Sequence, residues 1–225
     1  FRMLREQEKR NTISDAFVGF GDPHFDSQFL ERSSLNPIPL TREAILRMGH
    51  IIGKQEKTIF LGPGASETNV KKTNLARSQV IAFATHGLLS NQIDGLEESG
   101  LALSSPSIPD EFDDGILTSS EVATLDIKSP LVILSACNTG SRIRNSTELG
   151  LPSLGLAFFY AGADSIIASH WLAETTSTNK VIIKTIDNLV ANPSQRIADA
   201  LRNAKRTFLD SAAPIWSSHP MFWAT

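Results

Sequence analysis

The sequence feature that most constrains the fold is a set of short, continuously apolar runs that alternate with longer helical patterns. These runs cover residues 16–20, 58–61, 80–84, 131–134 and 165–168. Their apolar residues are consecutive, which is typical of strands that are covered on both faces. Strands that alternate with helices form parallel sheets through βαβ connections. The sequence therefore predicts an α/β fold, a three-layer αβα sandwich around a mainly parallel central sheet.

Residues that begin and end helices mark the segments between these runs. Ser66 precedes one helical pattern, and Thr118 forms a capping box with Glu121, three residues later. Pro152 stands near the start of a strongly apolar helix that Gly162 ends. Further helical patterns begin at residue 41 and cover residues 178–190 and 194–209.

One connection, from Gly87 to Gly115, breaks this rhythm. It is rich in Ser, Gly and Pro, and it ends in an acidic cluster at residues 110–114. Ligand sites of parallel sheets lie at the carboxyl ends of the strands. A long irregular excursion at that edge is more often functional than not, so this segment is a candidate functional loop.

Length and charge exclude several classes of protein. The chain has 225 residues and a formal net charge of −3, which argues against a nucleic-acid binder that works through bulk charge. No apolar run approaches the ~20 residues of a membrane span. A chain of this length buries enough apolar surface to fold without disulfides or a structural metal. We expect a cytoplasmic protein with no cofactor, no metal, and neither nucleic acid nor membrane as a partner.

The chain contains a single cysteine, Cys137, which excludes an internal disulfide and a multi-cysteine zinc site. A lone cysteine is most often a buried packing residue. Its surroundings favour another role, because Cys137 follows the run 131–134 and His86 follows the run 80–84. Consecutive parallel strands are usually adjacent, so both side chains are expected at one edge of the sheet.

The pairing of a thiol with an imidazole is the requirement of a cysteine nucleophile, whose pKa must be lowered. Such a nucleophile also needs donors for the oxyanion that forms on the attacked carbonyl. The backbone amides of Gly87 and Cys137 are candidates, because small residues leave the approach open. The alternatives are a strand-end histidine bonded to the backbone and a cysteine that only packs.

The motifs around these residues resemble those of caspase-like peptidases. The spacing from His86 to Cys137 is 51 residues (137 − 86), against about 50 in caspases, although Ser135 replaces their glutamine. The sequence is more similar to the CHAT domain, a caspase-like peptidase module often found behind tetratricopeptide repeats. The matching segments are collinear from about Gly19 onward: residues 83–87, 114–122, 134–140, 161–163, 167–171, 197–201 and 219–224.

This resemblance implies a caspase-like sandwich and a bacterial cysteine endopeptidase that cleaves protein or peptide substrates. It assigns Cys137 as the nucleophile, His86 as the histidine of the dyad and Gly87 as an oxyanion-hole residue. Because the chain begins with Phe1 and ends in an apolar run, we expect one domain over residues 1–225, cut from a longer protein. We expect residues 1–14 to be peripheral, and a tetratricopeptide-type regulatory domain in the parent chain to gate activity.

The resemblance also implies candidates for substrate-binding residues. Asp22 ends the first strand, where several caspase-like peptidases form the pocket for the substrate residue before the scissile bond, and an acid there favours a basic residue. The alternative is a turn aspartate; Asp26 and Glu174 are further candidates. The family commonly has leucine where His170 stands, and we expect His170 and Trp171 to border the substrate cleft.

Two other interpretations remain open, an inactive caspase-like interaction module and a flavodoxin-like ligand-binding domain. A calcium loop is disfavoured. Asp110, Asp114, Gly115 and Glu121 fall at EF-hand positions, but Phe112 stands at the third position and cannot bind a metal. A solvated loop is the better interpretation of this segment.

Overall fold

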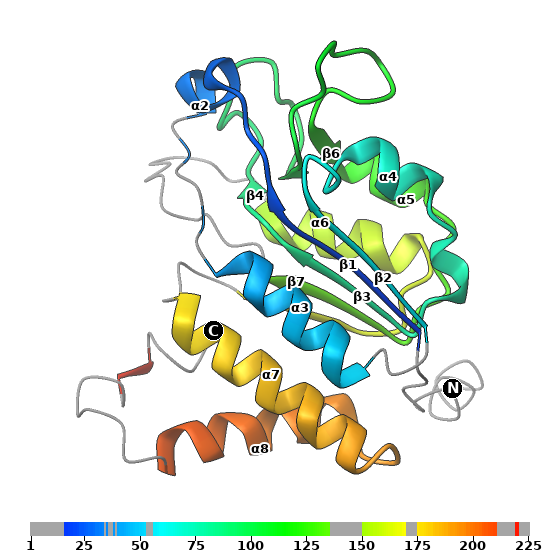
Figure 1. The fold of residues 1–225 in the computed structure, drawn as a ribbon, viewed down its shortest axis with the longest axis vertical. Coiled ribbons are helices and arrows are strands. Elements are labelled where there is room, and N and C mark those ends of the chain that lie inside the picture. The colour runs from blue at the N-terminus through cyan, green and yellow to red at the C-terminus, as the bar shows by residue number, and fades with distance from the viewer. Residues whose placement is uncertain are drawn as a thin grey trace.

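The computed structural model describes residues 16–33, 35, 38, 40–52, 56–135, 150–169, 175–210 and 219–220. Within these residues, five strands form a parallel sheet in the order β2-β1-β3-β7-β8. They are β1 (Ala16–Pro23), β2 (Glu56–Gly62), β3 (Val80–Ala84), β7 (Leu131–Ser135) and β8 (Ile166–Ala168). Each strand overlaps one of the five apolar runs, and the predicted αβα sandwich is confirmed (Figure 1).

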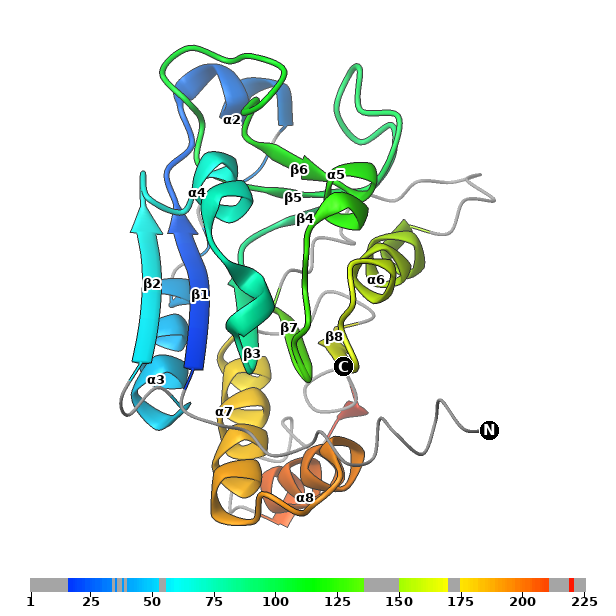
Figure 2. The same cartoon turned by 90° about the vertical axis from the view of Figure 1, so that its right-hand side faces the viewer.

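Helices cover both faces of the parallel sheet (Figures 1 and 2). One face carries α3 (Thr41–Ile52) and α7 (Thr175–Ala191), and α8 (Ile197–Asp210) packs against α7. The other face carries α4 (Glu67–Lys72), α5 (Ser119–Thr124) and α6 (Gly150–Tyr160). The short helix α2 (Ser27–Ser33) follows β1.

Burial on both faces explains why the strands are continuously apolar. In β3, Val80, Ala82 and Ala84 pack toward α3 and α7, whereas Ile81 and Phe83 pack toward α4, α5 and α6. All five residues are fully buried. A polar side chain at any of them would lose its contact with water, so the strand has no polar face to display.

A row of four phenylalanine rings crosses the sheet on the α4–α6 face. Phe20 of β1 is in register with Phe60 of β2 and with Phe83 of β3. Its ring stacks on both neighbours at centroid distances of 5.1 Å. Phe158 of α6 continues the row, 5.6 Å from Phe83 and tilted by 49°. This phenylalanine row joins three strands and one helix in a single apolar layer.

The connection predicted to be irregular contains a second, antiparallel sheet. Its three strands are β4 (Gly87–Leu88), β5 (Gly100–Ala102) and β6 (Ile116–Thr118), and β5 lies between the other two. Figure 2 shows this small sheet beyond the carboxyl ends of the parallel strands. Strands of two or three residues are too short to show a hydrophobic period, so the sequence pattern does not reveal them.

The predicted helix boundaries are confirmed at three places. The Ser66 hydroxyl accepts a hydrogen bond from the Asn69 N–H at 3.3 Å, and Thr118 and Glu121 form both bonds of the capping box. Gly162 ends α6 with a φ of +108°, and a Cβ there would collide with the carbonyl oxygen of Ile127. Only glycine fits at that position.

Candidate active site

His86 follows β3, and β5 holds its backbone in place. The His86 carbonyl accepts a hydrogen bond from the Ala102 N–H at 2.9 Å, and the Thr85 hydroxyl donates to the Ala102 carbonyl. The His86 side chain is buried, and its ring lies 6.0 Å from that of Phe25. Because two consecutive residues bond to one residue of β5, the small sheet fixes the direction in which the chain leaves β3.

The amide of Gly87 is turned away from the small sheet. Gly87 pairs with Leu101 of β5, and the flanking hydrogen bond joins the Ala102 amide to the His86 carbonyl. Gly87 and Leu101 therefore form a non-hydrogen-bonded pair of the antiparallel ladder. In such a pair the N–H groups point away from the partner strand, so the β4–β5 ladder does not use the Gly87 N–H.

The strands that precede the predicted dyad are neighbours. β3 and β7 are parallel, and Ala84 at the end of β3 is in register with Ser135 at the end of β7. Adjacent strands lie ~4.8 Å apart. In the sequence, His86 and Cys137 each come two residues after these paired positions. Cys137 itself lies outside the described residues, as do His170, Trp171 and Glu174.

A small cavity of about 20 Å³ lies beside His86. A cavity of this size holds about one water molecule. Thr85 and His86 line it from the end of β3, and Asp22 and Pro23 line it from the end of β1. The structure thus brings Asp22 and His86 to the same space, while the remaining lining residues are Phe25, Ile38 and Thr41.

Asp22 binds a cation of its own chain. Its φ is +52°, and its N–H donates to the Thr41 hydroxyl at 3.1 Å. Its Oδ2 accepts from Nε and Nη2 of Arg42, both at 2.8 Å. Sequence reasoning missed Arg42, because no pattern links the first turn of a helix to the end of a distant strand. The second acidic candidate, Asp26, caps α2 by accepting the Phe29 N–H at 2.7 Å.

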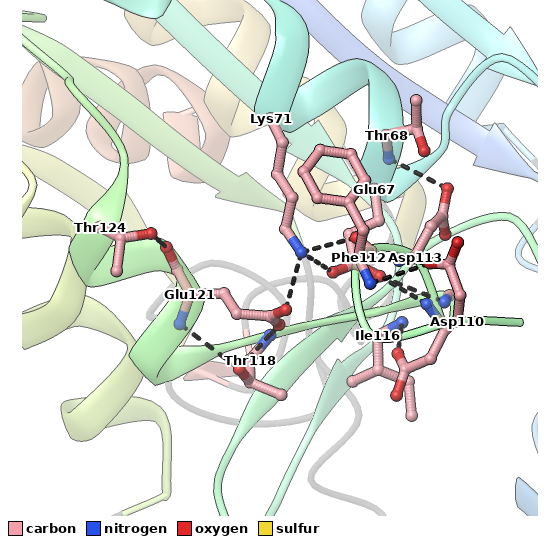
Figure 3. Close-up of polar contacts among 12 residues, drawn as sticks. Glu67, Thr68, Lys71, Asp110, Phe112, Asp113, Ile116, Thr118, Glu121 and Thr124 are labelled. Atoms are coloured by element: carbon pink, nitrogen blue, oxygen red, sulfur yellow. Dashed lines mark hydrogen bonds and ion pairs between the residues drawn. The ribbon is translucent and has the colours of Figure 1, made fainter.

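A second polar cluster, here called the lysine clasp, consists of Glu67, Lys71, Phe112 and Glu121 (Figure 3). The Lys71 Nζ lies 2.5 Å from Glu67 Oε1 and 2.7 Å from Glu121 Oε1, and it donates to the Phe112 carbonyl at 2.7 Å. Oxygens from α4, α5 and the excursion thus surround one ammonium. Glu121, the acid at the last EF-hand position, is thus paired with Lys71. Among the described residues, no cluster of Asp, Glu, His and Cys side chains could hold a metal ion.

The lysine clasp connects to the His86 segment through backbone hydrogen bonds. Glu67 Oε2 accepts from the N–H groups of Asp114 at 3.0 Å and Gly115 at 3.3 Å. The Gly115 carbonyl in turn accepts from the Leu103 N–H at 2.8 Å, next to the residue that binds His86. A fully buried carboxyl group on α4 therefore anchors the two strands β5 and β6.

The two acids of the clasp titrate differently. Burial raises the pKa of Glu67 to about 7, although the hydrogen bond from Lys71 acts in the opposite direction. Burial also raises the pKa of Glu121, but hydrogen bonds from Lys71 and Thr118 outweigh it and hold that pKa below its ordinary value. Glu121 is thus the permanent anion of the pair, and Glu67 is the group that exchanges a proton near neutrality.

The architecture is that of a caspase-like three-layer sandwich, with the candidate site at the carboxyl edge of the parallel sheet. The sequence model of the CHAT domain matches residues 1–225, the whole chain. The chain therefore belongs to the CHAT domain family, which is related to caspase-like cysteine peptidases. It has no significant match among the curated proteins. Within the described residues, no helix has the length and apolarity that a bilayer crossing requires.

Proposed function

We propose that this protein is a cysteine endopeptidase that cleaves protein or peptide substrates through a dyad of Cys137 and His86. The proposal is carried by the register of β3 and β7, which end level with each other two residues before His86 and Cys137. Membership of a family related to caspase-like peptidases supports it. The hold of β5 on the His86 backbone supplies the rigidity that a catalytic group needs.

The proposed reaction follows from the chemistry of these residues. The Cys137 thiolate attacks the peptide carbonyl carbon, and the amides of Gly87 and Cys137 bind the oxygen as it becomes negative. His86 protonates the leaving amine as the C–N bond breaks. His86 then takes a proton from water, which hydrolyses the thioester and releases the thiolate. Asp22, His170 and Trp171 would contact the extended substrate beside this centre.

The proposal also includes a setting for the reaction. The protein would act in the cytoplasm, where a single unpaired cysteine stays reduced. In a longer parent chain, a tetratricopeptide-type domain would gate the cleft. Comparing cleavage by the 225-residue chain with cleavage by that longer chain tests the gating, which predicts different rates on the same peptides.

A peptide-library cleavage profile tests the dyad. Cys137→Ala and His86→Ala should each abolish cleavage without unfolding the domain, although loss of the buried His86 ring should lower the melting temperature. His50→Ala is the matched control, since His50 is an exposed histidine on α3, and it should cleave like the wild type. Full cleavage by purified Cys137→Ala would contradict the proposal.

The second candidate function is a caspase-like interaction module without turnover, favoured by a cavity beside His86 with room for only about one water. Alkylation by iodoacetamide separates the two. A catalytic thiol reacts with a pH midpoint below ~8.5, and His86→Ala should move that midpoint upward. A wild-type midpoint at or above this value, together with no cleavage, would establish the module.

A further inference from the structure

The ion pair of Asp22 with Arg42 bears on which substrates the site accepts. Asp22 lines the same small cavity as His86, and its side chain is 41% exposed, so a substrate side chain can reach its carboxylate from the solvent. The structure nevertheless gives this carboxylate a guanidinium from the same chain, at 2.8 Å. Any cationic side chain of a substrate would therefore meet a carboxylate that is already neutralised.

Asp22 is the member of the pair whose backbone is fixed. The Asp22 N–H is bonded to the Thr41 hydroxyl, which itself donates to the Ile38 carbonyl at 3.1 Å. Thr41 is buried at 3% exposure, so this anchor is shielded from water. The positive φ of Asp22 is one that most residues avoid, and it persists only where surrounding contacts enforce it. The Asp22 backbone therefore stays in place if the arginine moves.

Arg42 is the removable member. Its side chain is 55% exposed and that of Asp22 is 41% exposed. Both of its contacting nitrogens bind the same oxygen, Oδ2, and among the described residues Asp22 Oδ1 has no partner. Exposed ion pairs of this kind change an equilibrium constant by a factor of about two to five. A competing cation of similar chemistry can therefore displace the arginine.

Resting on the proposed peptidase function, we propose that Arg42 is an internal competitor for Asp22. A substrate with arginine or lysine before the scissile bond binds Asp22 by displacing the Arg42 guanidinium. Arg42 is then a specificity-determining residue that limits, without abolishing, the preference for basic substrates. The substrate class is an extended protein segment with a basic residue at that position.

Kinetics on two peptides that differ only in arginine or glutamine before the scissile bond test this inference. Arg42→Ala should raise kcat/KM for the arginine peptide about two- to five-fold. Asp22→Asn should lower it at least tenfold, and asparagine tolerates the positive φ. The ratio of arginine-peptide to glutamine-peptide cleavage should therefore rise in Arg42→Ala and fall in Asp22→Asn. Arg196→Ala, which removes a similarly exposed pair with Asp199 on α8, should leave this ratio unchanged.

Binding of benzamidine to the Cys137→Ala chain gives a readout that needs no turnover. Its Kd should fall about two- to five-fold when Arg42→Ala is added and rise at least tenfold when Asp22→Asn is added. If these Kd changes are found but the wild-type chain cleaves no peptide, Arg42 competes for Asp22 as proposed and the peptidase function is rejected. If the peptides are cleaved but Arg42→Ala leaves the ratio of kcat/KM for the arginine and glutamine peptides unchanged or reduced, the competitor role of Arg42 is rejected and the peptidase function is kept.

Discussion

The two sheets of this protein are stabilised in different ways. The parallel sheet is held by apolar packing, with every residue of β3 buried and a phenylalanine row across one face. The small sheet that carries the His86 segment also buries apolar residues, among them Leu101 and Leu117, but directional contacts add to its hold, from the lysine clasp to the bonds at Ala102. The comparison teaches that the parallel sheet and the candidate site can lose their structure separately. Lost packing lowers global stability, whereas a lost polar contact displaces the site first.

The largest expected effect is on the apolar side of this comparison. Phe158→Ala should lower the free energy of unfolding by about 3–5 kcal/mol, because a fully buried ring leaves a cavity against Phe83. The next residue provides the control. Phe159 is 50% exposed, and Phe159→Ala should cost less than about 1 kcal/mol in the same denaturant titration. Equal losses would contradict the buried packing of α6.

The corresponding test on the polar side removes the ammonium of the lysine clasp. Lys71→Met should cost about 3 kcal/mol, because it leaves the buried Glu67 without its ammonium. Hydrogen exchange at the Ala102 amide, which binds the His86 carbonyl, should accelerate more than exchange in β3. Lys128→Met, which removes an exposed pair with Asp126, should leave both measurements unchanged. Equal acceleration in β3 and at Ala102 would show that the two sheets are not separable.

Two glycines, one in α6 and one directly after it, test how closely this helix and its last turn pack against the rest of the structure. Gly162→Ala should cost about 2–3 kcal/mol, because its φ of +108° is strained for alanine and the new methyl group meets Ile127. Gly155→Ala should raise stability by up to about 1 kcal/mol, since no described atom outside the glycine's own helical turn lies within 4 Å of the added methyl group. Thermal unfolding of both variants checks the opposite signs, and a neutral Gly162→Ala would contradict the turn geometry.

The smallest expected effect is a pH dependence confined to the clasp. The folded chain keeps a proton on Glu67 up to a pKa of about 7, whereas the unfolded chain loses it near 4.5. Between these values the folded state binds more protons, so the stability contributed by Glu67 falls as pH rises. From pH 5 to pH 7, the main part of this window, the fall should be about 2 kcal/mol. Glu67→Gln should flatten the curve in this window, while Glu121, with its lowered pKa, acts only at lower pH. An unchanged slope in Glu67→Gln would exclude Glu67 as its source.

The sequence predicts the parallel sheet and its helices well, because the patterns that indicate them lie within a few consecutive residues. The run 80–84 is a strand by composition alone, and the capping box of Thr118 and Glu121 spans four consecutive residues. β5 has no such signal, since its three residues form a strand only through their pairing with β4 and β6. The pairing of Arg42 with Asp22 is also invisible in the sequence, because it depends on how α3 docks against the end of β1.

The phenylalanine row has a consequence for how this domain can change over time. Each ring of the row sets the space available to the next, so a smaller residue at Phe20 would loosen Phe60 and Phe83 together. Losses at touching residues are not independent, and two substitutions in the row should cost an amount different from their sum. Sequence drift within this layer is therefore expected to proceed in coupled steps, with each accepted change altering which change can follow.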